Sequence, residues 1–200
     1  MRISAITLEG RHVRLEPLSQ QHEESLIVAA GDGQLWNSNV TIVPSRQTMA
    51  GYIESALQAQ SQDRELPFVI VRKDSGQVVG TTRFYDIALE EGRAAIGYTW
   101  LSLGAQRTAV NTESKLLLLT HAFESWHCNR VELITDVLNQ QSRDAILRLG
   151  AKQEGILRSH MRMPNGRIRD SVCFSIIARE WPEVRASLAD RLARRVEQVV

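Results

Sequence analysis

The chain lacks the features that would assign it to several large classes of protein. It has only two cysteines and five prolines among 200 residues, and it contains no run of about 18 apolar residues that could cross a membrane. Its 24 basic and 23 acidic side chains nearly cancel, which leaves no excess charge to attract nucleic acid or an anionic membrane surface. We therefore expect neither nucleic acid nor a membrane among its partners.

Candidate metal ligands are also few. Cys128 and Cys173 stand in apolar surroundings, and neither they nor the five histidines show the spacing of a zinc site. Buried free thiols are the simpler interpretation of the cysteines, and no metal is expected. Charged residues interrupt the first segment before a signal-peptide core could form, so a cytoplasmic location is the default expectation.

What the chain does have is enough material for a core. Apolar residues make up 43% of the sequence and charged residues 24%, as in ordinary globular proteins. We find no internal repeat, low-complexity segment or flexible linker that would divide it. A single domain over residues 1–200 is therefore expected.

Apolar periodicity and turn signals predict a mixed α/β order of elements. The expected strands are 12–18, 67–73, 77–87, 94–101 and 130–136, with a hairpin around Pro164-Asn165-Gly166 within 152–177. The expected helices are 19–30, 46–60, about 111–126, 139–150, and a C-terminal helix at about 181–197 with an inner stripe of Val184, Leu188, Leu192 and Val196. Three consecutive strands followed by a strand–helix–strand unit favour a mixed sheet with helices packed on its faces.

The start of the leucine-rich helix raises a separate question. Asn111, Thr112, Glu113 and Ser114 precede a block of leucines, and residues 105–110 lead into them. The first amides of a helix have no partner within the helix. A capping side chain can accept from them, or the amides and the helix dipole can together hold an anion such as a phosphate.

Four segments together resemble the GCN5-related N-acetyltransferase (GNAT) superfamily, in particular its branch with the RimJ/RimL ribosomal-protein acetyltransferases. The segments are VVGTTRFYDI (78–87), IGYTWL (96–101), QRTAVNTESKLLLLTHAFE (106–124) and CNRVELITDVLNQQSRDAILRLGA (128–151). The resemblance covers nearly the whole chain. It implies a three-layer α/β sandwich: a mostly antiparallel mixed sheet of about seven strands, helices on both faces, and a cleft where strand 94–101 splays from strand 130–136.

The resemblance implies acetyl-CoA as the cofactor, with its pyrophosphate at the amides that open the leucine-rich helix. The family pattern Gln/Arg-x-x-Gly-x-Gly/Ala falls on Gln106, Ala109 and Asn111, so neither small position is glycine. Ala109 suffices if its φ stays negative, and Asn111 can itself cap or bind a phosphate oxygen. Arg107 can add charge or point into solvent. The implied cofactor-binding residues are Trp100, Leu101, Gln106, Arg107, Thr108, Ala109, Val110, Asn111, Thr112, Asn139 and Ser142.

The implied reaction moves an acetyl group to a primary amine, of a protein N-terminus or of a small molecule, and this amine must first lose a proton. The backbone of Trp100 and Leu101 would pair with the pantetheine arm, and the Leu101 amide would stabilise the oxyanion. Asn139 and Ser142 match the family's Asn-x-x-Ser. Ser142 would then stabilise the leaving thiolate or relay a proton to it, and capping of the following helix is an alternative that does not exclude this role.

The general base is the open point of this interpretation. Ala95 and Met161 stand where the resemblance leads us to expect glutamates. His160 is the substitute candidate because imidazole accepts a proton near neutral pH. The alternation of Arg158, His160 and Arg162 equally predicts a solvated basic strand face. Lesser candidates are Glu113, Asp86, Asp136 and a chain of water molecules.

Three residues are candidates for contact with the acceptor. Tyr98 alternates with Ile96 and Trp100, a pattern more typical of core packing than of a hydroxyl that reaches the amine. Trp36 and Asn37 lie in a glycine-containing loop that borders the acceptor pocket in the resembling fold. A tryptophan in such a loop must find a partner or remain exposed.

A rival hypothesis is a non-catalytic coenzyme-A-binding or protein-interaction domain that keeps the fold. The absence of carboxylates at Ala95 and Met161 favours this rival, whereas the Asn139–Ser142 pair favours an enzyme. The C-terminal helix carries an apolar stripe and a basic face. We expect it to pack on its own domain, with a contact in a homodimer as the alternative.

Overall fold

The structure, a computed structural model, describes the backbone of residues 3–197 and the side chains of residues 3–194. Within this range eight strands form one sheet in the order β1-β2-β3-β4-β5-β6-β8-β7. Their bounds are β1 (Leu8–Glu9), β2 (Val13–Pro17), β3 (Leu66–Arg72), β4 (Val78–Ala88), β5 (Arg93–Leu101), β6 (Arg130–Asp136), β7 (Lys152–Arg162) and β8 (Ile168–Ile177). Neighbouring strands are antiparallel except β5 and β6, which run parallel.

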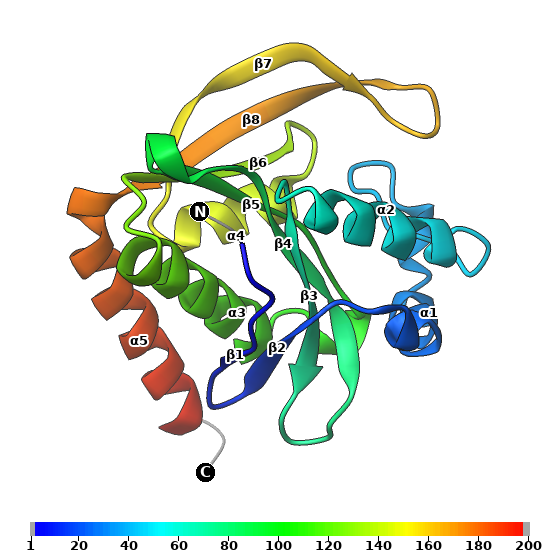
Figure 1. The fold of residues 1–200 in the computed structure, drawn as a ribbon, viewed down its shortest axis with the longest axis horizontal. Helices are drawn as coiled ribbons and strands as arrows, with labels where there is room; N and C mark the ends of the chain where they lie inside the picture. Colours follow the sequence, from blue (N-terminus) through cyan, green and yellow to red (C-terminus); the bar gives the residue numbers. More distant parts are fainter. Residues whose placement is uncertain (1–2, 198–200) are drawn as a thin grey trace.

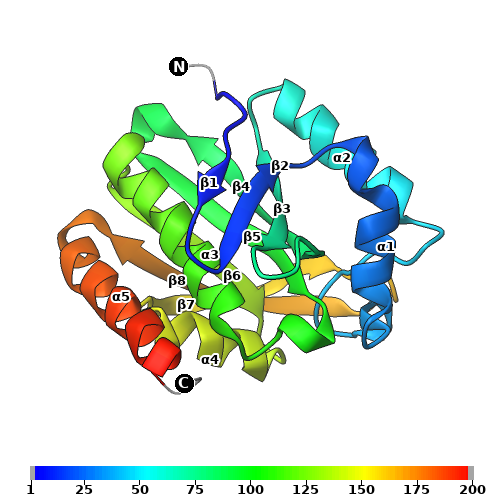
Figure 2. The ribbon, with the colours of Figure 1, turned by 90° about the horizontal axis from the view of Figure 1, so that it is seen from below.

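Helices cover both faces of the sheet, as Figures 1 and 2 show. The helices α1 (Glu23–Gly31) and α2 (Met49–Ser61) lie on one face, and α3 (Ala109–Thr120), α4 (Gln140–Arg148) and α5 (Trp181–Glu197) lie on the other. Short helical turns are η1 (Gln20–His22), η2 (Leu35–Asn37), η3 (Leu89–Glu91), η4 (Leu103–Ala105), η5 (His121–Ser125) and η6 (Ala178–Glu180). The expected three-layer sandwich is confirmed, with eight described strands rather than about seven. No helix in the described range has the length and apolar character that a membrane crossing requires.

Two buried clusters hold the layers together, because burial of apolar surface drives their packing. One cluster includes Leu118 of α3 and Leu188 of α5, and the other includes Leu26 of α1 and Ile53 of α2. The C-terminal helix therefore packs on its own sheet, as expected. Val184, Leu188 and Leu192 of its predicted stripe are buried. Val196, the fourth residue of the stripe, lies outside the described side chains.

Most differences from the expected elements lie at their ends. The leucine-rich helix was expected at about 111–126, but it begins at Ala109 and its last turn is the π-helical segment η5. Trp126 follows this segment, and its ring packs 4.6 Å from that of Phe84 on β4. The strand β1 was missed, because two residues are too few to show an alternating pattern.

A β-bulge interrupts β5. Two residues of this strand, Tyr98 and Thr99, lie opposite the single residue Thr82 of β4. Tyr98 has φ of 50°, a left-handed conformation that is uncommon for a residue other than glycine. An extra residue moves the following side chains to the opposite face of the sheet, so simple alternation fails here.

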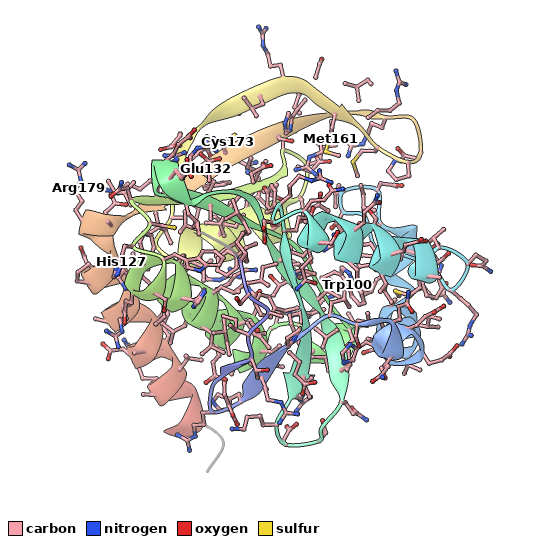
Figure 3. The ribbon with its side chains drawn as sticks, viewed as in Figure 1. Trp100, His127, Glu132, Met161, Cys173 and Arg179 are labelled. Carbon is pink, nitrogen blue, oxygen red and sulfur yellow. The ribbon has the colours of Figure 1, made fainter. Side chains whose placement is uncertain are left out.

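The bulge overturns the expectation that Tyr98 shares a core face with Ile96 and Trp100. Ile96 packs in the cluster under α3, whereas Trp100 packs in the cluster under α1 and α2. Figure 3 shows Trp100 on that second side of the sheet. The Tyr98 side chain lies outside both clusters and is 50% exposed.

The parallel strands β5 and β6 separate after a short paired stretch. Their register ends at the pair Ala95 and Glu132, although β5 continues to Leu101 and β6 to Asp136. Beyond this point each strand keeps only its outer neighbour, β4 for β5 and β8 for β6. The expected splay between the two strands is confirmed, and it opens a gap in the middle of the sheet.

Candidate active site

Two backbone amides of β5 point into this gap, and the first belongs to Leu101. In a trans peptide the N–H group points away from the preceding carbonyl oxygen. The Trp100 carbonyl oxygen lies so close to Gly80 of β4 that a Cβ atom there would be 2.0 Å from it. The Leu101 amide therefore points away from β4 and toward the gap, as the sequence interpretation requires.

The second amide belongs to Thr99, in the bulge. The carbonyl oxygen of Tyr98 accepts a hydrogen bond of 3.0 Å from Thr81 Oγ1 of β4. By the same peptide geometry the Thr99 N–H group points away from β4, on the side where β5 and β6 no longer pair with each other. Sequence reasoning missed this amide because it could not locate the bulge.

The α3 helix opens at one end of the gap. Thr108 is its N-cap: Thr108 Oγ1 accepts from the Val110 amide at 3.3 Å and donates to the Ala105 carbonyl oxygen at 2.7 Å. The left-handed residue of the turn is Arg107, with φ of 58°, whereas Ala109 is helical. The condition that φ of Ala109 stays negative is therefore met.

The structure is compatible with both a capping side chain and an anion at this helix start. The cap serves the Val110 amide, so this one of the amides that open the helix is not left for a ligand. Asn111 lies inside the first turn and is not the cap. The amides of Ala109 and Asn111 have no acceptor within the helix, and the helix dipole favours an anion beside them. A phosphate would therefore find two backbone donors here.

Gln106 connects β5 to α4 at the edge of the gap. Its Nε2 atom donates to the Leu101 carbonyl oxygen at 3.0 Å, and its Oε1 atom accepts from Gln141 Nε2 at 3.1 Å. These side-chain bonds hold the end of β5 in place. They use the amide group that the sequence interpretation assigned to the cofactor.

The first turn of α4 faces the same region. Asn139 Oδ1 accepts a hydrogen bond of 3.0 Å from the Ser142 amide, so Asn139 is the N-cap of this helix. The alternative in which Ser142 caps the helix is therefore wrong. The Ser142 hydroxyl lies on the first turn and is half-buried.

On the face of α1 and α2, aromatic and charged groups hold the Tyr98 ring. The Arg83 guanidinium lies 4.4 Å from the ring centroid of Tyr98 and 4.4 Å from that of Tyr52, and the Tyr85 ring meets Tyr98 edge-on at 5.5 Å. Arg83 Nη1 also donates to Glu65 at 2.8 Å. Burial, and then the charge of Glu65, raises the pKa of Tyr98. Its hydroxyl stays protonated at neutral pH and can donate a hydrogen bond.

His160 lies on the edge strand β7, beside an open hollow of about 730 Å³ that Leu157, Arg158 and Asp170 also line. Its Nδ1 atom is 2.9 Å from Ser171 Oγ of β8. Three residues of β7, from 158 to 160, oppose one residue of β8, so the expected alternation of cations along this strand is interrupted. The His160 side chain is exposed.

The loop between α1 and α2 meets the tip of the β7–β8 hairpin. Arg167 Nη2 donates to the Asn39 carbonyl oxygen at 2.8 Å, and Asn165 Nδ2 lies 3.4 Å from Asn39 Oδ1. Figure 1 shows this hairpin tip extending toward the side of α2. Trp36 and Asn37 form part of the same loop in η2, and the Trp36 side chain is 38% exposed.

Two of the lesser candidates for the general base, Glu113 and Asp136, already have partners within the fold. The Glu113 carboxylate accepts three backbone hydrogen bonds, from Arg11 at 2.9 Å, His12 at 2.6 Å and Val13 at 2.7 Å. Asp136 is fully buried, accepts from the Leu138 amide and pairs with Arg167. Both carboxylates stabilise the fold and are poor choices for a proton acceptor. Asp86 borders a separate hollow of about 140 Å³.

Sequence reasoning also missed Glu132. It is the cross-strand neighbour of Ala95 on the last paired position before the gap. Val131 and Leu133 on either side of it are in the core under α3, so the Glu132 side chain points to the opposite face. Arg130 Nε donates to it at 2.8 Å, and 31% of its side chain is exposed. The sequence did contain a signal for Glu132, because it is a charged residue between two apolar ones in the segment RVELITD.

Glu132 belongs to a group of titratable residues on that face. Burial first, and negative charges that include Glu132, raise the pKa of Tyr85. The pKa of Cys173 on β8 is raised by burial and then by Glu132, and Figure 3 shows these two residues near each other. A carboxylate thus stands next to Ala95, where the resemblance had led us to expect one.

The sheet, the gap and the open helix define a class of protein. A parallel strand pair that splays, followed by a helix whose N-terminus opens beside the gap, is the architecture of acetyl-CoA-dependent transferases. The sequence matches the acetyltransferase (GNAT) domain model over residues 12–152. The chain belongs to the GNAT acetyltransferase family.

Known proteins of similar sequence and structure agree. The chain is 33% identical over 116 residues to an uncharacterized N-acetyltransferase, p20, of Bacillus licheniformis; the match covers 57% of this chain and 63% of the relative, under two thirds of its length. A GCN5-related N-acetyltransferase from Brucella melitensis has a TM-score of 0.85 at 29% identity, with 96% of this chain and 87% of that one covered. Mycobacterium smegmatis RimJ, solved with CoA-disulfide, has a TM-score of 0.77 at 20% identity, covering 94% and 93%.

Proposed function

We propose that the protein transfers an acetyl group from acetyl-CoA to a primary amine by direct attack, with residues 1–200 acting as one domain. The observation that carries this proposal is the end of the β5–β6 register at Ala95 and Glu132, beyond which the two strands no longer pair with each other. The gap offers the strand edges that an extended pantetheine arm needs. The start of α3 offers donors to a phosphate within the same structure.

The cofactor-binding residues fit such a ligand. The amides of Ala109 and Asn111 would donate to the pyrophosphate, and Arg107 would add charge at the same turn. The Thr99 and Leu101 amides would line the path of the pantetheine arm along β5. Acetyl-CoA would supply an acetyl group activated as a thioester.

The chemistry then needs few groups from the protein. The neutral amine nitrogen forms a bond to the thioester carbonyl carbon, the carbon–sulfur bond breaks, and the thiolate leaves and takes up a proton. A backbone amide facing the gap, from Thr99 or Leu101, stabilises the negative charge that develops on the carbonyl oxygen. The Ser142 hydroxyl, on the first turn of α4, would donate to the departing sulfur. The protonated amine loses two protons in total: the thiolate takes up one of them, and a base must accept the other.

Two groups on the acceptor face can accept that proton. Glu132 stands at the point where the strands separate, next to the position of Ala95. His160 stands on β7 with its ring near Ser171. We favour Glu132, because its strand borders the gap itself, whereas His160 is on the far edge of the sheet. Tyr98, held by Arg83, would orient the acceptor by a hydrogen bond.

The acceptor would enter from the face of α1 and α2. Its pocket would lie between the α1–α2 loop, with Trp36 and Asn37, and the β7–β8 hairpin. An amine of a protein N-terminus and a small-molecule amine are the two acceptor classes that this opening admits.

A thiol-release assay tests the proposal. Purified protein, acetyl-CoA and a panel of peptides and small amines are mixed, and free coenzyme A is followed with a chromogenic disulfide. We expect release that depends on at least one acceptor and produces the acetylated amine by mass spectrometry. Protection of the protein from thermal unfolding by coenzyme A, without release for any amine, would instead support a non-catalytic coenzyme-A-binding domain. Absence of both would contradict either function.

A further inference from the structure

The inner face of α3 carries a buried cation that the proposed chemistry does not use. Lys115 is 5% exposed, and its Nζ atom donates to Thr99 Oγ1 of β5 at 2.5 Å and to Thr82 Oγ1 of β4 at 3.2 Å. The two threonine hydroxyls lie 2.8 Å apart. These residues are the ones at the β5 bulge, seen from the side of α3.

Among the residues that the structure describes, no carboxylate pairs with this amine. Thr82 from β4 and Thr99 from β5 are the groups that face it, while Arg83 contacts Tyr52 and Tyr98 on the opposite face of the sheet. Burial alone lowers the pKa of Lys115 to about 7. The amine therefore changes charge within the physiological pH range.

Stability does not account for a lysine at this position. Burying an ammonium group without a carboxylate is unfavourable, because desolvation is not offset by an ion pair. An apolar side chain of similar length would fill the space without that cost. The atoms that Lys115 contacts offer a functional reason for a lysine here.

Thr99 links Lys115 to the gap. Its hydroxyl donates to the Gly97 carbonyl oxygen at 3.3 Å and accepts from Lys115, so the side chain is held on the α3 side of the bulge. Its backbone amide, anti to the Tyr98 carbonyl oxygen, points into the gap. A change at the Lys115 amine is transmitted to this amide through one residue.

We propose that Lys115 is a positioning residue for acetyl transfer: through Thr99 it holds the β5 bulge so that the Thr99 amide faces the thioester carbonyl, and its positive charge lies behind that amide. The proposal rests on the proposed function. It assigns the amide of Thr99, rather than that of Leu101, to the oxyanion. The charged amine strengthens the donor by electrostatic stabilisation, which is large where water is excluded.

The variant Lys115→Met removes the amine and keeps a long side chain. At pH 6.5 we expect kcat to fall about tenfold or more, while the KM for acetyl-CoA changes less than about twofold, since the lost interaction develops only in the transition state. The ratio of wild-type to variant kcat should decrease as the pH rises from about 6 to about 9, because the wild-type amine loses its proton. Lys73→Met, at a lysine that pairs with Glu9 on the surface, is the matched control.

The pH dependence of the kcat ratio separates a positioning role of Lys115 from a structural one. The titration of the acceptor amine is the same for both proteins and cancels in this ratio. A loss that is independent of pH, or no loss at all, would overturn the proposal. Thermal unfolding at pH 6 gives a second control: the variant should be at least as stable as the wild type, which shows that lost activity is not lost folding.

A measurement without turnover keeps this test apart from the test of the function. The Thr99 amide ¹⁵N signal should titrate with a midpoint near the lysine pKa of about 7 in the wild type and stay flat in Lys115→Met. A Thr99 signal that does not titrate in the wild type overturns the link whatever the activity. A signal that titrates in a protein that acetylates no amine would support the link and contradict the acetyl transfer.

Discussion

The α3 helix buries two charged residues of opposite sign that do not pair with each other. Glu113 accepts three hydrogen bonds from the turn between β1 and β2, and Lys115 donates to two threonines at the bulge. Gly10 of that turn has no Cβ atom, and one placed there would lie 2.5 Å from Glu113 Cδ. Glu113 thus holds the turn between β1 and β2, whereas the hydrogen-bond partners of Lys115 are two neutral hydroxyls.

The lowered pKa of Lys115 makes stability depend on pH. The unfolded lysine keeps its proton up to about 10.5, whereas the folded one loses it at about 7, so folding releases a proton between these values. The free energy of unfolding of the wild type should therefore rise with pH relative to Lys115→Met, by up to about 1.4 kcal/mol per pH unit. Urea denaturation of both proteins from pH 7 to 10 measures this difference. A constant difference would show that the amine titrates in its ordinary range.

Glu132 is the residue on which the proposed proton transfer depends. Glu132→Gln should lower kcat/KM by about 10²-fold or more at neutral pH, because a carboxamide cannot take the amine proton. Arg130 also pairs with Glu154 of β7, so Glu154→Gln is a matched control that disturbs the same arginine. Steady-state kinetics of both variants and of His160→Gln give the answer. Full activity of Glu132→Gln together with loss in His160→Gln would transfer the role to the histidine.

At the scale of elements, the start of α3 combines a cap with two amides, of Ala109 and Asn111, that have no acceptor within the helix. Thr108 serves the Val110 amide, and Arg107 adopts the left-handed φ at the turn before it. Two neighbouring features, the bulge in β5 and the cap of α4 by Asn139, direct further donors toward the same gap. Each element contributes backbone atoms rather than side chains, so the sequence marks these donors only indirectly.

Charge reversal at Arg107 tests this helix start. Arg107→Glu should weaken coenzyme A binding about fivefold, roughly 1 kcal/mol, because it places a negative charge beside the anion site. Arg107→Gly removes the charge and adopts the same left-handed φ easily, so its smaller effect separates charge from backbone geometry. Titration calorimetry at low and high salt measures both, and screening should reduce the effect of the glutamate. Equal affinities for the three proteins would place the phosphates elsewhere.

At the scale of the whole molecule, Arg167 joins three parts that are distant in sequence. It extends from the β7–β8 hairpin to the buried Asp136 at the end of β6 and to the Asn39 carbonyl oxygen in the α1–α2 loop. These contacts tie the hairpin across the proposed acceptor opening. The proposed acceptor pocket would therefore depend on an arginine that need not touch the acceptor.

Removal of this arginine should affect both folding and the acceptor. Arg167→Ala leaves the Asp136 carboxylate buried without its cation and should lower the free energy of unfolding by about 3 kcal/mol. The KM for the acceptor should rise while that for acetyl-CoA stays the same, because only the acceptor opening loses a contact. Arg162→Ala, on the same hairpin, is the control. If the double variant Arg167→Ala/Asp136→Asn regains stability but keeps the raised acceptor KM, the two effects are separate. An unchanged acceptor KM in Arg167→Ala would contradict the role of Arg167 at the acceptor opening.

The elements and their order were determined by the sequence alone, because apolar periodicity, turn residues and caps act over a few neighbours along the chain. The strand 94–101 and the mixed sheet with helices packed on its faces were both predicted from such local patterns. The two-residue strand β1 and the left-handed Tyr98 were not, since the first is too short for a pattern and the second depends on the register with β4.

Contacts between residues on different strands and helices were decided only by the tertiary structure. Glu132 becomes a neighbour of Ala95, and Lys115 of Thr99, through pairing and packing between segments far apart in the chain. The bulge decides which amide faces the gap, and Arg167 decides how the hairpin meets the opposite loop. Such contacts depend on one-residue register shifts and on the paths of side chains, and neither leaves a periodic signal in the sequence.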